Sequence, residues 1–316
     1  MLNAILKQLP WMLALFVLGP IAAMLTGALR AVDGSGNATL LLGIAPAKGI
    51  LAGLVTLGFA GGVGVFASRL NGSRSGLNAA GIVLAWAASQ TATIDAILRR
   101  ADSAAPLTIL AVEGLVFGLL AVPVAAIIWQ AGLGRGLHGS LHPLPDGSPS
   151  LGAYLTAPPT NAKGLRPEHE SLTATLLRAF IRPAGLGAIG VTVVVGFVIS
   201  YLVCQDTLKG QAIFAAALTG IVAVPVGRMV GETLKEQPPL AAFVAGFAVL
   251  GLVGPLAAKF MQGSEIIATL YQGDLLGVAA PVSLDWIAGA CIGLPIGEAW
   301  FLSMFQSQTA KTAASR

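Results

Sequence analysis

Eight apolar segments, each near the length that crosses a bilayer, constrain this chain more than any other feature of its sequence. A transmembrane helix needs about 20 apolar residues. The composition agrees, because 55% of the 316 residues are hydrophobic and 10% are charged, which is too apolar for a soluble protein. The sequence therefore predicts an all-α polytopic integral membrane protein. The predicted spans are Trp11–Ala31, Leu41–Phe66, Leu77–Leu98, Leu107–Trp129, Ala184–Cys204, Ala212–Val230, Leu240–Phe260 and Ser283–Phe305.

The eight segments divide into two groups of four that match in order, and the fourth span of each group gives the best match. Glu113 lies ten residues before Pro123, and Asp285 lies ten residues before Pro295. A second match places Lys48 at the start of one span and Lys209 just before another. Because each group holds an even number of spans, both groups have the same orientation, which predicts two parallel four-helix repeats.

The predicted organisation has four parts. A first four-helix membrane repeat covers 1–131, and a second covers 183–306. Residues 132–182 between them form a cytoplasmic connector that ends in a short interfacial helix, and residues 307–316 form a cytoplasmic tail.

Lys and Arg residues are distributed unevenly between the two sides of the predicted bundle. Twelve lie on the side of the N-terminus and six lie on the other side. The positive-inside rule therefore places both termini and the connector in the cytoplasm, as expected for a protein of a bacterial cytoplasmic (inner) membrane. The net charge of +4 follows from this topology, and no basic run with interleaved aromatic residues indicates nucleic-acid binding.

Small residues and prolines occur inside the spans in patterns that bear on packing. Gly49 and Gly53, and likewise Gly58 and Gly62, are separated by one helical turn. Such faces allow two helix backbones to approach closely, either within this chain or against a second copy or a partner subunit in the membrane. Three prolines are predicted to kink their helices, namely Pro123, Pro225 and Pro295.

Two acidic residues occupy matching positions of the two groups and are the leading candidates for an ion path. An ionisable group inside a span is costly, and therefore is a functional hypothesis by default. If Glu113 and Asp285 face a shared cavity, they can bind a proton or a cation. Asp285 also has a structural interpretation, because it falls in the first turn of its helix, where Ser283 can act as the cap.

Two further acids have less regular surroundings. Glu298 has no acidic counterpart in the first group, because Ala126 occupies the matching place. A specialised site and a side chain that extends toward the cytoplasm both fit this position. Asp95 precedes Arg99 by one helical turn, which predicts an ion pair near the outer boundary of the third span.

The third span contains the most polar stretch of any predicted span, Ser89-Gln90-Thr91-Ala92-Thr93. Helical spacing would place Trp86, Ser89, Gln90 and Thr93 close together. Such groups either line a solute path or form hydrogen bonds between helices. Gln90 is the candidate for binding an uncharged polar group.

No metal, cofactor or enzymatic activity is predicted. The three histidines, His138, His142 and His169, all lie in the connector, whose Gly- and Pro-rich surroundings favour a solvated linker over a metal site. Cys204 and Cys291 fall at different depths, so a disulfide is not expected. The chain contains no Walker loop, no H-E-x-x-H and no G-x-S-x-G motif.

Two functions remain open from the sequence. The first is a small-solute or ion transporter, coupled to protons through Glu113 and Asp285, with Gln90 and Glu298 on the path. The second is a non-transporting scaffold or assembly subunit, in which the glycine faces bind partner helices and the acids are caps. The lipid bilayer is the one partner common to both.

Overall fold

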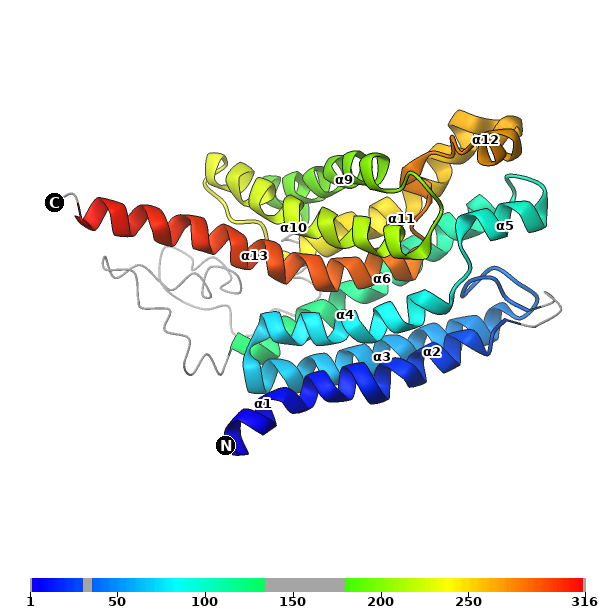
Figure 1. The fold of residues 1–316 in the computed structure, drawn as a ribbon. Coiled ribbons are helices and arrows are strands. Elements are labelled where there is room, and N and C mark those ends of the chain that lie inside the picture. Colours follow the sequence, from blue (N-terminus) through cyan, green and yellow to red (C-terminus); the bar gives the residue numbers. More distant parts are fainter. Residues whose placement is uncertain (1, 31–35, 134–179, 315–316) are drawn as a thin grey trace.

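In the computed structural model, residues 2–30, 36–133 and 180–314 can be described, and all their regular structure is helical. Figure 1 shows a bundle of helices that lie side by side along one axis, with both termini at the same end of the bundle. The elements are α1 (Leu2–Leu13), a π-helical turn η1 (Ala14–Leu18), α2 (Gly19–Gly27), α3 (Pro46–Asn71), α4 (Ser73–Gln90), α5 (Ile94–Ala101), α6 (Pro106–Leu133), α9 (Pro183–Val203), α10 (Lys209–Thr233), α11 (Leu240–Gln262), η2 (Gly263–Glu265), α12 (Ile266–Gln272), η3 (Gly277–Ala279) and α13 (Ser283–Ala314).

The two ends of the bundle are named here by what they carry. The connector face is the end where α6 finishes and α9 begins, and the termini lie at this end. The loop face is the opposite end, which carries α5, α12 and the loop between α2 and α3.

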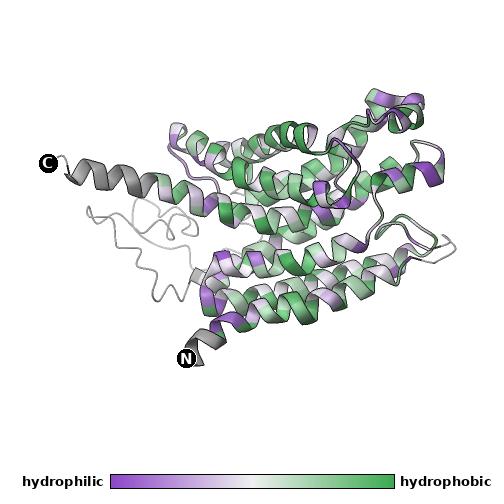
Figure 2. Cartoon of the chain, in the orientation of Figure 1, coloured by the Kyte–Doolittle hydropathy of each residue, from purple (hydrophilic) through white to green (hydrophobic). Residues whose placement is uncertain are grey.

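Eight stretches of helix in the described part of the chain are long and apolar enough to cross a membrane. Figure 2 shows apolar residues along the length of the bundle and polar residues mainly toward its two ends. Outward-facing side chains are also apolar, and Val194 on α9 is 64% exposed. The predicted class is therefore confirmed: the chain is an all-α, multi-pass integral membrane protein whose outer faces contact lipid.

The second span starts later than predicted. Helix α3 begins at Pro46, whereas the sequence predicted a span from Leu41. The intervening residues belong to a loop closed by Asn37, whose Nδ2 donates to the Ala45 carbonyl at 3.0 Å and whose Oδ1 accepts from the Ala45 N–H at 2.9 Å. Leu40 in this loop is fully buried. Hydropathy alone cannot distinguish such a buried loop from a helix.

The third span is interrupted, although the sequence predicted one continuous helix from Leu77 to Leu98. Helix α4 ends at Gln90, and α5 begins at Ile94. Thr91 and Thr93 have extended backbone conformations, with ψ angles of 152° and 156°. The polar stretch identified in the sequence is therefore where the helix breaks.

The two halves pack by exchanging contacts between their third and fourth spans. Helix α6 of the first half packs along α11 of the second, and α13 of the second half packs along α4 of the first. Glycines bring these helices together, since a Cβ atom on Gly114 would lie 2.4 Å from the Gly251 carbonyl oxygen and one on Gly118 would lie 2.6 Å from Ala248 Cα. Backbone contact thus joins the halves.

The predicted glycine pairs divide between the inside and the outside of the bundle. Gly49 and Gly53 face inward, where a Cβ would collide with the Leu40 carbonyl oxygen or the Phe117 ring. Gly58 and Gly62 lie on the same helix with open space beside them. Pro123, Pro225 and Pro295 lie inside α6, α10 and α13, within the helices where the sequence placed them.

The contact between α6 and α11 predicts that an added methyl group lowers stability at this contact more than on the open face of α3. Gly118→Ala should destabilise the protein by about 1–3 kcal/mol, because the new methyl group has no room against Ala248. Gly58→Ala is the matched control, since it adds the same group to a helix where nothing lies within 4 Å. Thermal unfolding of the two variants in detergent would test this, and equal unfolding temperatures would contradict it.

Candidate functional site at the loop face

Asp285 lies in the first turn of α13 and is fully buried. Its Oδ2 accepts a hydrogen bond from the backbone N–H of Val282 at 2.9 Å, as acidic residues at the third helical position often do. Its Oδ1 has no hydrogen-bond partner among the described residues. The helix-start interpretation is therefore confirmed for one carboxylate oxygen, and the other oxygen is left without a role in the cap.

Lys209, the first residue of α10, supplies the positive charge opposite Asp285. Its Nζ lies 2.9 Å from Asp285 Oδ2, and the lysine side chain is 16% exposed. The same Nζ donates a longer hydrogen bond of 3.4 Å to the Ala92 carbonyl oxygen. The charge pair is therefore largely buried, and only the lysine is partly exposed.

The break between α4 and α5 provides that carbonyl group. Because Thr91 and Thr93 are extended, the Ala92 carbonyl can point to Lys209. The Ala92 N–H donates to the Ala38 carbonyl at 2.8 Å, and the Thr93 hydroxyl accepts from the Ala96 N–H to cap α5. Two backbone groups of the interrupted segment thus find hydrogen-bond partners: the Ala92 N–H binds the α2–α3 loop, and the Ala92 carbonyl binds a lysine from the other half.

Glu113 lies two turns into α6 and is fully buried without a cationic partner among the described residues. Its Oε2 accepts from the Thr39 hydroxyl and from the Leu41 N–H at 2.7 Å, and its Oε1 accepts from the Ser283 hydroxyl. Ser283 was predicted to cap α13, but its hydroxyl binds Glu113 instead. Neutral donors therefore satisfy this acid.

The structure thus gathers the two predicted acids into one group of residues at the loop face, because Glu113 binds Ser283, and Asp285 lies in the same helical turn as Ser283. We call it the junction cluster, because two of its hydrogen bonds cross between the halves: Ser283 to Glu113, and Lys209 to the Ala92 carbonyl. Its members are Thr39, Ala92, Glu113, Lys209, Ser283 and Asp285.

Glu298 lies near the opposite end of the bundle, in a second buried ion pair. Its Oε2 is 3.1 Å from Nη2 of Arg228, and both side chains are at most 2% exposed. Arg228 also donates from Nη1 to the Pro238 carbonyl at 2.7 Å. Glu298 is therefore part of a satisfied network that links α10, α13 and the start of α11, and it does not extend toward solvent.

Gln90 is half-buried, and its hydrogen bonds within the described chain are not to members of the junction cluster. Its side-chain amide donates to the Ser89 hydroxyl at 3.3 Å, and its backbone carbonyl accepts from Arg30 at 3.0 Å. Helical spacing was expected to bring Thr93 close to Trp86, Ser89 and Gln90. That expectation fails for Thr93, because helix α4 ends at Gln90. Gln90 nevertheless lies beside the break, one residue before the extended segment.

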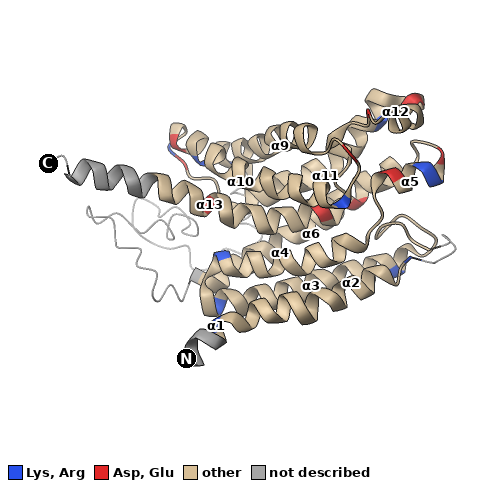
Figure 3. Ribbon diagram, viewed as in Figure 1, with Lys and Arg blue, Asp and Glu red and all other residues tan. Residues whose placement is uncertain are grey.

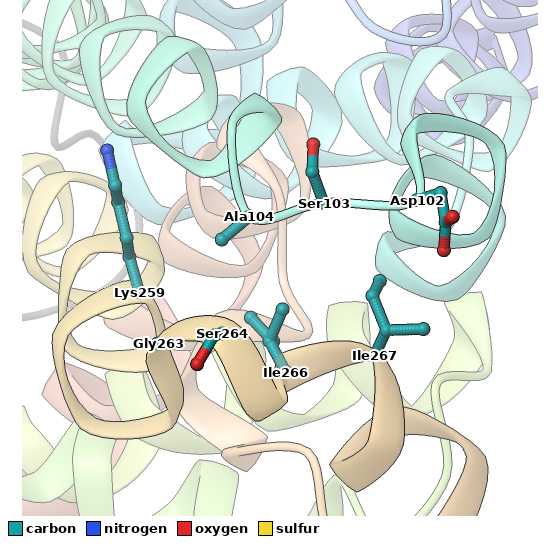
Figure 4. A pocket seen from close by; sticks show the side chains of 8 residues that line it. All are labelled: Asp102, Ser103, Ala104, Lys259, Gly263, Ser264, Ile266 and Ile267. Carbon is teal, nitrogen blue, oxygen red and sulfur yellow. The ribbon is translucent and has the colours of Figure 1, made fainter.

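The charged residues of the described chain lie mostly toward the two ends of the helices (Figure 3). At the loop face, Asp95 and Arg99 form the predicted ion pair on α5. A pocket of about 340 Å³ lies nearby, between the turn before α6 and the turn after α11 (Figure 4). Lys259 on its rim donates to the Thr108 hydroxyl at 2.7 Å, and none of the predicted site residues lines it.

Cys204 and Cys291 are free, as the sequence predicted, and the structure shows that both are buried. Burial raises the pKa of the Cys204 thiol to about 12, and the nearby charge of Asp285 adds to the rise. This thiol is therefore neutral at physiological pH. No group of three metal-binding side chains occurs within the described ranges, and His138, His142 and His169 lie outside them, as does most of the predicted interfacial helix.

Two residues of these networks were not identified as site residues from the sequence. Lys209 entered the alignment of the two halves and the count of charges on each side of the membrane, and Arg228 entered only that count. One signal could have found Lys209, because Lys48 and Lys209 match in the same alignment that pairs Glu113 with Asp285. No comparable signal marked Arg228.

Comparison of the chain with protein-family models, with curated proteins and with solved structures found no match.

The buried ion pair predicts a recognisable pattern of stabilities. Lys209→Met and Asp285→Asn should each cost about 3–5 kcal/mol, because each leaves a polar or charged partner unpaired. The double variant should recover most of that loss. Unfolding of all four proteins in mixed micelles would measure the coupling, and simply additive losses would show that the two side chains do not interact.

Proposed function

We propose that this chain is a small-solute or ion transporter whose conformational change is coupled to protonation at the junction cluster. One observation carries the proposal: the buried pair of Lys209 and Asp285 lies at a broken helix where the two halves meet. The supporting argument has three parts, which concern the charges, the broken helix and the contact between the halves.

The charges are the first support. Carboxylates and ammonium groups inside membrane spans are costly and tend to mark ion or substrate paths. An acid that only caps a helix needs no further polar group. Asp285, however, also has a buried oxygen, Oδ1, with no hydrogen-bond partner in the described chain. Packing alone does not account for that oxygen, whereas an ion-binding role does.

The broken helix is the second support. Discontinuous helices in transporters expose backbone groups that bind substrates and coupling ions. Backbone without helical hydrogen bonds is tolerated at membrane depth only where it is buried in protein or lines a cavity. The broken segment at Ala92 meets this condition, because Ala92 is buried and its carbonyl accepts a hydrogen bond from Lys209.

The contact between the halves is the third support. A proton on Asp285 would remove the charge that holds Lys209, and Lys209 would then hold the Ala92 carbonyl less firmly. Two parallel four-helix repeats would rock against each other in such a cycle. The exchanged packing of α6 on α11 and of α13 on α4 supports this repeat. From the charge bias, we propose that the protein lies in a bacterial inner membrane with its connector face toward the cytoplasm.

A scaffold function is the alternative that one surface feature favours. Gly58 and Gly62 face open space on α3, where a partner helix or a second copy could pack closely. In that case the buried acids would be fixed structural groups, and the halves would not move.

Cysteine accessibility distinguishes the two functions without knowledge of the substrate. Single cysteines would replace Gln90 and Thr93 in a Cys204→Ser/Cys291→Ser background and react with a membrane-impermeant maleimide from each side. For a transporter, we expect the accessible side to change between pH 5.5 and pH 8, and Asp285→Asn to hold one pattern at both pH values.

Two control positions make the result interpretable. Val194→Cys faces lipid and should not react from either side, whereas Asp206→Cys lies in an exposed loop and should react at both pH values. A pattern at Gln90→Cys and Thr93→Cys that ignores pH and Asp285→Asn, with both controls normal, would contradict transport and favour the scaffold.

A further inference from the structure

We infer that the junction cluster is a cation site whose cation is the chain's own Lys209 ammonium group, so that the site takes a proton and excludes sodium and potassium. The coupling role of that proton rests on the proposed function. The existence of the cation site does not, and it can be tested by itself.

The ligands of the site are oxygen atoms in an apolar setting. Asp285 Oδ2 and the Ala92 carbonyl oxygen lie 2.9 Å and 3.4 Å from the Lys209 nitrogen. Asp285 Oδ1 is fully buried and has no partner among the described residues, so it remains available as a third ligand. A carboxylate combined with the carbonyl of an unwound helix is the arrangement that binds sodium or protons in transporters.

The second acid of the cluster is engaged elsewhere. Glu113 accepts hydrogen bonds from Thr39, Ser283 and the Leu41 N–H, and the ion pair of Lys209 in the described chain is with Asp285. Cys204 faces the site from the end of α9 and is neutral, because burial raises its pKa to about 12. The charges of Asp285 and Lys209 therefore cancel, and no other titratable group among the described contacts faces them.

This balance determines which ion can enter. A metal cation beside Lys209 would place two positive charges against one carboxylate in a site with little water, where repulsion is strong. A proton avoids that conflict, because it joins a carboxylate oxygen of Asp285 and leaves Lys209 as the one remaining charge. The lysine can then move toward its exposed side.

Removal of the lysine should convert the site into one that binds free cations. In Lys209→Ala, Asp285 and the Ala92 carbonyl would surround an empty position of about the size of an alkylammonium group. Ethylammonium, sodium or potassium could then take the place of the side chain and stabilise the folded state in proportion to binding.

Thermal unfolding of the purified full chain in detergent tests this at pH 8 and constant ionic strength. The salts compared would be the chlorides of ethylammonium, sodium, potassium and choline. For the wild type, we expect no difference between sodium and choline. For Lys209→Ala, we expect at least one small cation to raise the unfolding temperature by about 5 °C relative to choline.

Three further variants make the result specific. Lys209→Ala/Asp285→Asn should show no cation response, because the carboxylate is gone. Lys259→Ala removes another loop-face lysine, one that donates to Thr108 and lies outside the cluster, and should behave as the wild type. Lys209→Gln serves in place of Lys209→Ala if the latter does not fold.

The outcomes separate this inference from the proposed function. Sodium-specific stabilisation of the wild type would overturn it, as would a lack of cation response in both Lys209→Ala and Lys209→Gln. If the cation response appears but cysteine accessibility does not change with pH, the site exists and the transport proposal fails. If accessibility alternates but no cation response appears, transport stands and this inference fails.

Discussion

The interior of a bilayer offers no water, so each charge and each free backbone group in this protein needs a partner within the chain. The ion pair between Lys209 and Asp285 is where this constraint has the widest consequences. It fixes the starts of α10 and α13, and it supplies a donor to the carbonyl that the broken third span exposes at Ala92. Loss of either charge would therefore affect both halves.

The two halves satisfy their matching acids in different ways. In the second half, Asp285 forms an ion pair with Lys209. In the first half, the matching lysine, Lys48, is exposed, and the loop that contains Thr39 and Leu41 supplies neutral donors to Glu113 instead. Gly49 makes room for this loop. One half thus holds a carboxyl group bound by neutral donors, and the other holds a charge pair, which we propose a proton opens.

The sequence predicted the class of fold because hydropathy and helix length depend on the solvent more than on tertiary contacts. It also singled out Glu113 and Asp285, since charges within apolar runs are conspicuous. It did not predict the break after Gln90 or the buried loop before Pro46, because both depend on long-range hydrogen bonds, from Ala92 to Ala38 and from Thr39 and Leu41 to Glu113. The role of Arg228 was also missed, because its partner Glu298 lies 70 residues away in the chain.

The protonation state of Asp285 is proposed to set how the two halves are arranged, and pulsed electron spin resonance can measure that arrangement. Spin labels at positions 44 and 206 would report the loop face, and labels at 69 and 232 would report the connector face. We expect opposite distance changes at the two faces between pH 8 and pH 5.5, and we expect Asp285→Asn to give the low-pH distances at pH 8. Identical distances in every condition would contradict it.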